Sequence, residues 1–370
     1  MATANERQTS NGRRPAGKRP SKQQREARKK RKVIIFGLEI ALLLVMLVVL
    51  WGVMKGTEVK RIEVNDEELK ENMNETVLEN ETLKGYRNVA LFGVDSTTGA
   101  LEKGTRSDTI IIASINQDTG DVKLVSVYRD TYLNKGNDKY GKCNAAYANG
   151  GPKQAMMMLN MNMDLNITDF VTIGFKGLAD TIDALGGVWI DVDEAELQHI
   201  NNYQMCIAEN LKCSYTEVKE TGYQLLDGLQ ATAYCRIRYT KGDDFMRAQR
   251  QREVIKAIAD QAKKANVSSL TKIANDVFPE VYTSLKLEEI VSLLTEISKY
   301  NIVDEGGFPH ESMRATGTIG ADGSCVVPID LESNVVWLHE FLFDEAGYTP
   351  SKDVQAYSEK VFNDTNKYLK

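Results

Sequence analysis

The chain has 370 residues, of which 26% are charged and 42% hydrophobic, a composition that excludes a chain disordered throughout. The charge is uneven, because residues 1–32 carry twelve Lys and Arg against two Glu, whereas residues 55–370 have a net charge of −15. Such an acidic part repels anionic ligands overall, so a phosphate site within it must be built from clustered arginines.

The N-terminal segment contains a basic tail followed by a long apolar run. Residues 1–32 have no hydrophobic stretch and are predicted to be a disordered cytoplasmic tail. Residues 33–54, "VIIFGLEIALLLVMLVVLWGVM", contain one charge, Glu39, and as a helix would extend about 33 Å, enough to cross a bilayer. A buried soluble helix of this length would show a polar face, and a cleaved signal peptide has a shorter apolar run. The basic tail therefore predicts a single-pass protein of the cell membrane, with a cytoplasmic N-terminus and an extracellular C-terminal part.

The remaining chain is predicted to hold one α/β domain between two polar segments. Residues 55–85 are Glu-rich and are interpreted as an extracellular juxtamembrane spacer, in which one strand and one helix are expected. Residues 86–345 alternate between short apolar runs and amphipathic segments, and residues 346–370 are interpreted as a polar C-terminal tail. The pattern predicts an α/β/α domain with a central mixed sheet.

The first part of this domain contains a predicted β-hairpin with a charged open end. Residues 88–95, "NVALFGVD", form a short apolar strand, and two β-branched runs then flank the turn sequence "NQDTGD". If the turn is centred between residues 118 and 119, antiparallel pairing places Asp108 opposite Arg129. Arg106 and Asp130 are then immediate neighbours, so four charges of both signs meet at one end of the sheet.

Further elements follow in alternation. The run "DTIIIASI" is apolar at successive positions, so its strand is expected to be covered on both faces. Asp243 or Asp244 is the expected N-cap of a long amphipathic helix. Strands are predicted over residues 169–175 and 188–192, and helices over residues 151–163, 176–187, 222–239, 243–266, 287–300 and 333–343.

Two acidic residues at strand ends are candidate metal ligands. Asp95 ends the first apolar strand and Asp108 begins the next, so their carboxylates are expected to converge. Hard oxygen ligands suit Mg²⁺ or Mn²⁺, and Mg²⁺ usually keeps water and substrate phosphates in its shell. The alternative for either residue alone is a strand-end cap or a surface ion pair.

The segment "RIRYTKGDDFMRAQRQREVI" concentrates arginines. Arg236 and Arg238 project to one side if their segment is extended, and Arg247, Arg250 and Gln251 share one face of the following helix. Arginine recognises phosphate through two parallel hydrogen bonds, so this segment is a candidate phosphate site. The alternative is a solvated basic helix face paired with nearby acids. Nucleic acid is not expected as a ligand, because aromatic residues are not interleaved with the arginines.

Other possible sites are weaker. The sequence "GNDKYGKC" at residues 136–143 nearly fits a P-loop, but Cys143 replaces the hydroxyl that binds Mg²⁺ and no strand directly precedes it. The three histidines lie outside any hydrolase motif, which argues against a Ser-His-Asp enzyme. Five cysteines are no disulfide framework, although Cys206 and Cys213 are able to close a small loop as an alternative to free thiols.

Taken together, the motifs resemble those of the LytR-CpsA-Psr family of bacterial cell-wall glycopolymer transferases. The resemblance covers residues 86–265 well and continues more loosely to about residue 345. Two positions depart from the family pattern: Tyr128 stands where proline is often found, and Cys143 stands where an aliphatic residue is common. The matching motifs, in the family's order, are "LFGVDS", "RSDTIIIASIN", "LVSVYRDTYL", "KCNAAYANGG", "DFVTIGFKGLADTIDALGGV" and "LLDGLQATAYCRIRYTKGDDFMRAQRQREVI".

The resemblance implies an enzyme that moves a glycopolymer from a polyprenyl pyrophosphate carrier onto peptidoglycan through a phosphodiester. By position, Asp95 and Asp108 resemble the family's Mg²⁺-associated acids, and Asp130 also falls in a family motif. The catalytic set expected from this is Asp95, Asp108, Arg129 and Asp130, and the pyrophosphate-binding set is Arg106, Arg129, Asn144, Arg236, Arg238, Arg247 and Gln251.

Several questions stay open at the level of the sequence. Asp108 or Asp130 is the expected general base for the acceptor hydroxyl. The helices "QAMMMLNM" and "LADTIDAL" are candidates to line a groove for the prenyl chain, although ordinary core packing is the stronger explanation of both. The alternative functions are hydrolysis of the same pyrophosphate and a non-catalytic membrane-anchored regulator whose basic tail binds anionic lipid or nucleic acid.

Overall fold

The computed structural model describes residues 60–61, 69, 73–96, 100–238, 240–265, 270, 273, 277 and 280–369. All of them belong to one compact unit, Lys55–Lys370. The predicted basic tail and the predicted membrane span lie outside the described residues. Within the described ranges, no helix combines the length and apolar character that crossing a membrane requires.

A seven-stranded mixed sheet forms the centre of this unit, as predicted. The pairs β2–β3, β3–β4 and β7–β10 are antiparallel, and β2–β7, β4–β11 and β1–β10 are parallel. In spatial order the strands are β1 (Lys60–Arg61), β10 (Val281–Thr283), β7 (Asp169–Gly174), β2 (Tyr86–Val94), β3 (Ser107–Asn116), β4 (Asp121–Val127) and β11 (Asn301–Phe308).

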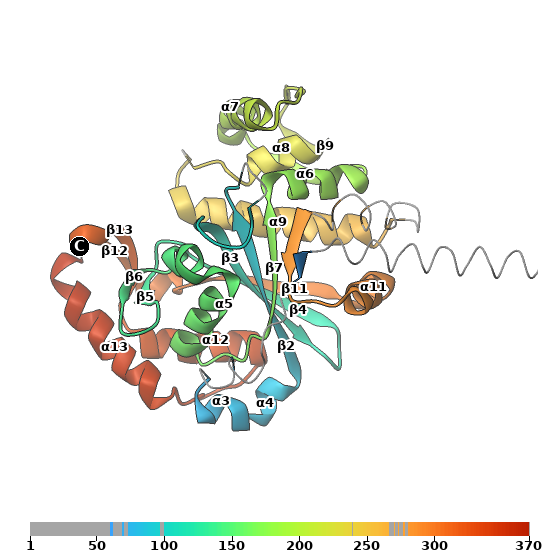
Figure 1. Ribbon diagram of the computed structural model, residues 1–370. Coiled ribbons are helices and arrows are strands. Elements are labelled where there is room, and N and C mark those ends of the chain that lie inside the picture. The colour runs from blue at the N-terminus through green and yellow to red at the C-terminus, as the bar shows by residue number, and fades with distance from the viewer. Residues whose placement is uncertain are drawn as a thin grey trace, which may run out of the picture. The chain divides into compact units, whose positions relative to one another are not determined.

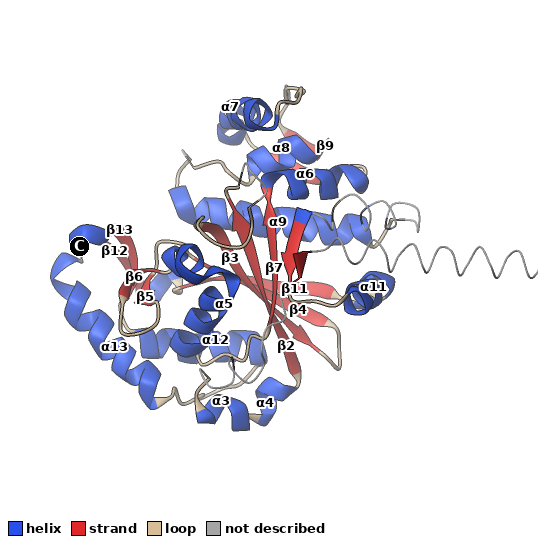
Figure 2. Ribbon diagram, in the orientation of Figure 1, coloured by secondary structure: helices blue, strands red, loops and turns tan. Residues whose placement is uncertain are grey.

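Helices cover both faces of the sheet (Figures 1 and 2). Ile110 and Ile112 of β3 face the larger core, and Ile111 faces a second cluster that includes Ile255 of α9. This confirms both the α/β/α architecture and the prediction that β3 is buried on its two faces. One face carries α3 (Glu75–Glu79), α4 (Glu81–Lys84), α5 (Asn144–Met163), α12 (Leu331–Phe343) and α13 (Lys352–Thr365); the other carries α6 (Phe175–Ala184) and α9 (Asp243–Ala262).

Smaller elements surround these layers. The ribbon of β8 (Val188–Val192) and β9 (Gly222–Leu226) packs with α6 and α9 through a separate apolar core. The other elements are α7 (Glu194–Leu211), α8 (Gly228–Tyr234), α11 (Leu287–Thr295), the antiparallel pairs β5 (Tyr132–Asn134) with β6 (Tyr140–Lys142) and β12 (Arg314–Ile319) with β13 (Gly323–Pro328), and short 3₁₀ turns at Ile297–Lys299, Glu311–Met313, Gly320–Asp322 and Asn366–Tyr368.

The predicted hairpin register is confirmed. Ile111 pairs with Ser126 and Ile115 with Val122, so continuing the same register places Asp108 opposite Arg129. The turn is held by the Asn116 side chain, which accepts hydrogen bonds from the backbone N–H of Asp118 and Thr119.

The predicted helix over residues 222–239 is wrong in its first part. Residues 222–226 form strand β9, and the helix begins only at Gly228. Asp227 stops the strand and starts the helix, because its side chain accepts the N–H of Gln230 while Gln230 caps the backbone of Asp227. Tyr223 and Leu225 alternate outward with exposed side chains, a period of two that the surrounding helix-forming residues obscured.

Two further helix starts differ from the prediction. The N-cap of α9 is Gly242, and not Asp243 or Asp244, because a positive φ of 98° at this position favours glycine. Helix α5 starts at Asn144, seven residues earlier than predicted, and has non-helical angles at Gly150 and Gly151 directly before Pro152. The cysteines at 206 and 213 are free thiols.

The predicted boundaries of the domain are too narrow at both ends. Strand β1 joins the sheet, and Val77 and Leu83 enter the main core, so the part of residues 55–85 that the structure describes belongs to the domain and is not a spacer. The predicted polar tail after residue 345 is also wrong, because α13 packs on the domain through the fully buried Val354 and Val361. Polar residues on the outer face of α13 conceal this short apolar stripe.

Substitutions at two adjacent positions of α13 test this correction. Val361 is fully buried, whereas Phe362 is 49% exposed. Val361→Ala is expected to lower the free energy of unfolding by about 1.5–3 kcal/mol through lost apolar burial and a cavity. Phe362→Ala is expected to cost under about 1 kcal/mol. Urea unfolding measures both, and equally small losses would support a tail that does not pack.

Candidate active site

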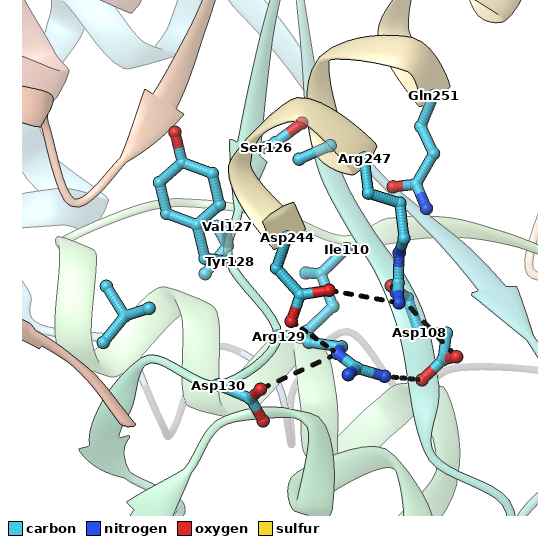
Figure 3. A pocket seen from close by; sticks show the side chains of 12 residues that line it. Asp108, Ile110, Ser126, Val127, Tyr128, Arg129, Asp130, Asp244, Arg247 and Gln251 are labelled. Carbon is cyan, nitrogen blue, oxygen red and sulfur yellow. Dashed lines mark hydrogen bonds and ion pairs between the residues drawn. The ribbon is translucent and has the colours of Figure 1, made fainter. Parts of the chain in front are cut away.

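Charged side chains from three elements meet at one end of the central sheet (Figure 3). Arg129, two residues after β4, places Nη1 2.8 Å from Oδ1 of Asp108 on β3. Its Nε lies 3.4 Å from Oδ2 of Asp244, at the start of α9. Nη1 of Arg247, one turn further along α9, lies 3.3 Å from Oδ1 of Asp244. The hairpin and the N-terminus of α9 therefore build one cluster of alternating charge.

A β-bulge presents Asp108 to this cluster. Along β2, Gly93 pairs with Thr109 and Val94 pairs with Ser107, so Asp108 is an extra residue without a partner on β2. A bulge bends the strand and redirects the side chain, and bulges are common beside active sites. Glycine is required at 93, because a Cβ there would stand 2.8 Å from the Thr109 hydroxyl oxygen.

The two central arginines differ in their electrostatic environment. Burial opposes the charge of Arg129, but the carboxylates of Asp108 and Asp244 outweigh it and raise the pKa of Arg129. Burial, with a contribution from the nearby charge of Arg129, lowers the pKa of Arg247. Only 6% of the Arg247 side chain is exposed, and it donates to the backbone carbonyl of Asp108. Both guanidinium groups remain charged at neutral pH, because arginine does not deprotonate in proteins.

A large cavity opens beside the cluster, between the sheet and helices α6, α8 and α9. Its volume is about 500 Å³, within the range of small-molecule sites. Its charged end is lined by Asp95, Asp108, Arg236, Arg238, Arg247 and Gln251, and its walls are mainly apolar, with Leu91, Val171, Ile173, Phe175, Leu178, Val254, Ile255 and Ile258.

Arg236 and Arg238 approach this cavity in different ways. The guanidinium carbon of Arg236 lies 4.3 Å from the centroid of the Phe175 ring, a cation–π contact. Arg238 places Nε 3.1 Å from Oδ1 of Asp244, and its buried Nη2 has no hydrogen-bond partner among the described residues. A buried donor of this kind is costly unless a ligand accepts from it.

Arg250 shares one face of α9 with Arg247 in the sequence spacing, but its side chain lines neither cavity at the cluster. Its side chain is 2% exposed and its Nε lies 2.6 Å from Oε1 of Glu196. It also donates to the carbonyl of Ile237 and to the hydroxyl of Thr240. Arg250 therefore supports the segment that carries Arg236 and Arg238 from behind.

The two predicted metal ligands, Asp95 and Asp108, both line the large cavity. Asp95 is 47% exposed and lies 3.8 Å from Arg236, so its oxygens are largely unengaged. No group of three or more His, Cys, Asp or Glu suited to a metal occurs in the described part of the chain. A divalent cation on Asp95 and Asp108 would need phosphate oxygens and water for the rest of its shell, which fits the preference of Mg²⁺.

The loop after Arg129 is fixed by residues from the predicted motifs. Asp130 forms an ion pair with Lys142, in which Nζ of Lys142 lies 3.1 Å from Oδ1 of Asp130. The Asn144 backbone N–H donates to the carbonyl of Arg129, so this residue supports the loop, and its side chain lines neither cavity at the cluster. Cys143 donates its thiol to the carbonyls of Tyr128 and Arg129, and burial raises the pKa of this thiol to about 12.

The remaining predicted site residues and helices lie partly at the large cavity and partly away from it. Gln251 lies at the large cavity as expected, while Arg106 is exposed and has no ion pair to the cluster within the described ranges. Of the two helices proposed to line a prenyl groove, α6 contributes Leu178 and Thr181 to the wall of the large cavity. The Met-rich helix does not, because Met156 and Met158 are buried in the core on the opposite face of the sheet.

Two functional residues were missed from the sequence. Asp244 contacts three arginines but was considered only as a helix cap. Its spacing of three from Arg247 is the signal that indicates an ion pair on one helix face. Lys142 reaches Asp130 only through the β5–β6 pairing, for which the sequence offers no local signal.

Comparison with known proteins identifies the family. The LytR_cpsA_psr family model matches residues 50–326, which is most of the chain. The chain belongs to the LytR_cpsA_psr family. This confirms the resemblance stated from the motifs.

Individual relatives and solved structures are also similar to this chain. The polyisoprenyl-teichoic acid–peptidoglycan teichoic acid transferase TagU of Enterococcus faecalis is 33% identical over 271 residues, which cover 71% of this chain and 81% of TagU. A crystal structure of a transcriptional regulator from E. faecalis has a TM-score of 0.57 at 25% identity, covering 78% of this chain and 97% of that one. Bacillus subtilis TagV has a TM-score of 0.55 at 25% identity, covering 72% and 99%.

Asp244 offers a direct test of the cluster. Asp244→Asn leaves Arg129, Arg238 and Arg247 with fewer counter-charges, and is expected to lower the free energy of unfolding by about 1–3 kcal/mol. Added inorganic pyrophosphate is expected to raise the melting temperature more in this variant than in the wild type, because an anion replaces the lost carboxylate.

The matched control for this experiment is the adjacent, exposed Asp243. Asp243→Asn removes the same charge from the helix N-terminus and is expected to cost under about 1 kcal/mol. Equal effects of the two substitutions in thermal unfolding would show that Asp244 has no special place among the arginines.

Proposed function

We propose that the chain is a membrane-anchored phosphotransferase that moves a glycopolymer from a polyprenyl pyrophosphate carrier onto peptidoglycan through a phosphodiester. The observation that supports this most directly is an apolar cavity that ends in clustered arginines. A ligand with a long apolar chain and a pyrophosphate head matches that distribution of walls and charge. The similarity to E. faecalis TagU, which is named as a teichoic acid transferase, points to the same reaction class.

The donor is bound in two parts. The prenyl chain occupies the space between the sheet and α6, where Leu178, Ile255 and Ile258 exclude water. The pyrophosphate takes the charged end, where the unpartnered Nη2 of Arg238 gains an acceptor. Bidentate arginine contacts fix the orientation of the phosphates as well as their position.

The protein contributes mainly charge and position to the transfer. Phosphoryl transfer requires the incoming and leaving oxygens to stand roughly in line, with negative charge on the non-bridging oxygens. Arg129 and Arg247 are held by Asp108 and Asp244 before substrate arrives, so little reorganisation is required when that charge develops. This arrangement also explains how an acidic domain binds an anion, since the local cluster opposes the overall field.

Asp95 and Asp108 are the residues that would hold Mg²⁺ or Mn²⁺. A bound divalent cation would neutralise charge on the donor phosphates. The loose contact of Asp95 with Arg236 supports this assignment, because it leaves carboxylate oxygens available.

The N-terminal sequence completes the proposal. Residues 33–54 anchor the chain in the cell membrane, with the basic tail in the cytoplasm and the domain outside. This arrangement places the domain on the side of the membrane where peptidoglycan and the extracellular end of a lipid carrier are found.

A transfer assay tests the proposal. Full-length protein in detergent is incubated with a labelled polyprenyl-pyrophosphate saccharide, peptidoglycan and Mg²⁺. Arg129→Met or Arg238→Met is expected to lower kcat/KM by about 100-fold or more, through loss of a charge-assisted contact to phosphate. Lys352→Met removes one exposed positive charge on α13 and should leave the rate within about twofold.

Two outcomes of this assay would contradict the proposal. The first is a wild-type protein that transfers no more label to peptidoglycan than Arg129→Met does, because such a protein has no transferase activity. Release of free sugar phosphate in the absence of peptidoglycan would instead identify a pyrophosphatase that uses the same site.

Metal removal is a separate test. Treatment with EDTA is expected to abolish transfer, and Mg²⁺ or Mn²⁺ should restore it. In Asp95→Asn the Mg²⁺ concentration that gives half-maximal rate should rise about tenfold, equivalent to about 1.4 kcal/mol of binding free energy. Undiminished transfer in EDTA, or an unchanged metal requirement in Asp95→Asn, would contradict the metal assignment.

A further inference from the structure

A second, much smaller cavity lies on the other side of the charged cluster. Its volume is about 20 Å³, enough for one water molecule or one hydroxyl group. It shares Asp108, Arg247 and Gln251 with the large cavity, so these three residues separate the two spaces. The smaller cavity is referred to below as the hydroxyl pocket.

The hydroxyl pocket has a polar wall and an apolar wall. Its polar wall consists of the cluster together with Asp130. Tyr128, Ala248 and Val326 form the apolar wall, and Figure 3 shows Tyr128 on the far side of Asp244 from Asp108. Three carboxylates and two guanidinium groups surround this space for a single oxygen. A carboxylate there can accept the proton of a hydroxyl group, and the guanidinium groups can hold a phosphate next to the hydroxyl oxygen.

The position of the pocket matters for the reaction. Under the proposed function, on which this inference rests, the leaving group is a polyprenyl phosphate in the large cavity. Because the attacking oxygen stands roughly in line with the leaving oxygen, it must approach from the face of the phosphorus opposite the large cavity. The hydroxyl pocket lies at the cluster on that other side.

We propose that the acceptor hydroxyl of a saccharide enters the hydroxyl pocket and that the carboxylate of Asp130 takes its proton. The hydroxyl oxygen forms a bond to the phosphorus that carries the glycopolymer. The bond from this phosphorus to the bridging oxygen breaks, and its electron pair leaves with the polyprenyl phosphate. The proton passes to Asp130, so the products are a glycopolymer phosphodiester and a polyprenyl phosphate.

Of the three carboxylates at the hydroxyl pocket, Asp130 has the weakest contacts with arginine. Asp108 lies 2.8 Å from Arg129, and Asp244 contacts three guanidinium groups. Asp130 has its Oδ1 held by Lys142 at 3.1 Å, while its Oδ2 lies 3.8 Å from the Nε of Arg129. One oxygen is therefore oriented by an ion pair, and the other remains available to accept a proton.

The backbone and the surrounding groups define the position of Asp130 further. Its carbonyl accepts the N–H of Val326 on β13, so the β12–β13 pair holds the residue in place. The charged and titratable groups that face it are Arg129 in the same loop, Lys142 of β6, Arg247 of α9, and the thiols of Cys143 and Cys325. Burial raises the pKa of both thiols, so neither competes as a base at neutral pH.

The experiment separates transfer from donor binding in the full-length protein. Asp130→Asn is expected to lower the transfer rate by about 100-fold or more. Its Kd for polyprenyl pyrophosphate, from calorimetric titration, should stay within about threefold of wild type. Asp108→Asn should weaken that binding, and Asp138→Asn, an exposed carboxylate in the β5–β6 turn, should change neither quantity.

A second readout identifies a base rather than a structural support. Small alcohols of decreasing pKa replace peptidoglycan as acceptor, and the dependence of rate on alcohol pKa is measured. The transfer rate should increase as the pKa of the alcohol falls, and this increase should be steeper in Asp130→Asn than in the wild type. The reason is that the variant no longer removes the proton from the alcohol.

Two other variants test the pocket if Asp130→Asn does not fold. Lys142→Met releases Oδ1 of Asp130 and should slow transfer about tenfold without weakening donor binding. Ala248→Val adds two methyl groups beside a space of about 20 Å³ and should block saccharide acceptors, again with donor binding retained.

The inference is overturned by normal transfer in Asp130→Asn or Ala248→Val, or by parallel losses of transfer and donor binding in Asp130→Asn. A wild-type protein that binds polyprenyl pyrophosphate but transfers to no hydroxyl would instead contradict the proposed function. The two failures are therefore distinguishable.

Discussion

The ion pair between Asp108 and Arg129 is the contact on which the rest of the site depends. It joins residues 21 positions apart at 2.8 Å, and the hairpin register alone brings them together. With the strand ends joined in this way, Asp108 becomes a wall shared by both cavities, and Arg129 reaches Asp244 on a third element. A one-residue slip of the hairpin would turn both side chains to opposite faces and separate them.

Burial explains why the cluster contains so many acids for a site that binds an anion. Arg247 is almost fully buried, and an unpaired buried charge is unfavourable by several kcal/mol. Asp108 and Asp244 neutralise it in the free protein and hold the arginines apart from one another. A phosphate group then binds to guanidinium groups that are already oriented, with Arg238 offering a donor that no described residue satisfies.

The sequence predicted the parts of the site that depend on local pattern. Residues close in the sequence determine the hairpin turn, the strand alternation and the arginine spacing. The pairing of Asp108 with Arg129 could therefore be predicted from the sequence. The same holds for the location of Arg236, Arg238 and Gln251 at one cavity. The family resemblance contributed the expected reaction, and it also included Arg106 and Asn144, which the structure places outside both cavities.

What the sequence could not predict depends on tertiary contacts. The bulge at Asp108 lies where Thr109 approaches Gly93 closely on the neighbouring strand, a contact that only the folded sheet creates. The sequence indicates Asp244 only as a helix cap, because its contact with Arg129 depends on the folded hairpin. The spacing of Arg250 places it on the helix face of Arg247, but its side chain forms a buried ion pair with Glu196 instead. The sequence of helix α13 is mostly polar, and only a narrow stripe around Val354 and Val361 is buried.

A crystal structure of the full-length protein with a polyprenyl pyrophosphate and a short saccharide acceptor would test the central claim most directly. The account predicts pyrophosphate oxygens against Arg129, Arg238 and Arg247, the prenyl chain between the sheet and α6, and an acceptor oxygen in the hydroxyl pocket. A pyrophosphate bound away from these arginines, or a donor and an acceptor entering through the same cavity, would contradict it.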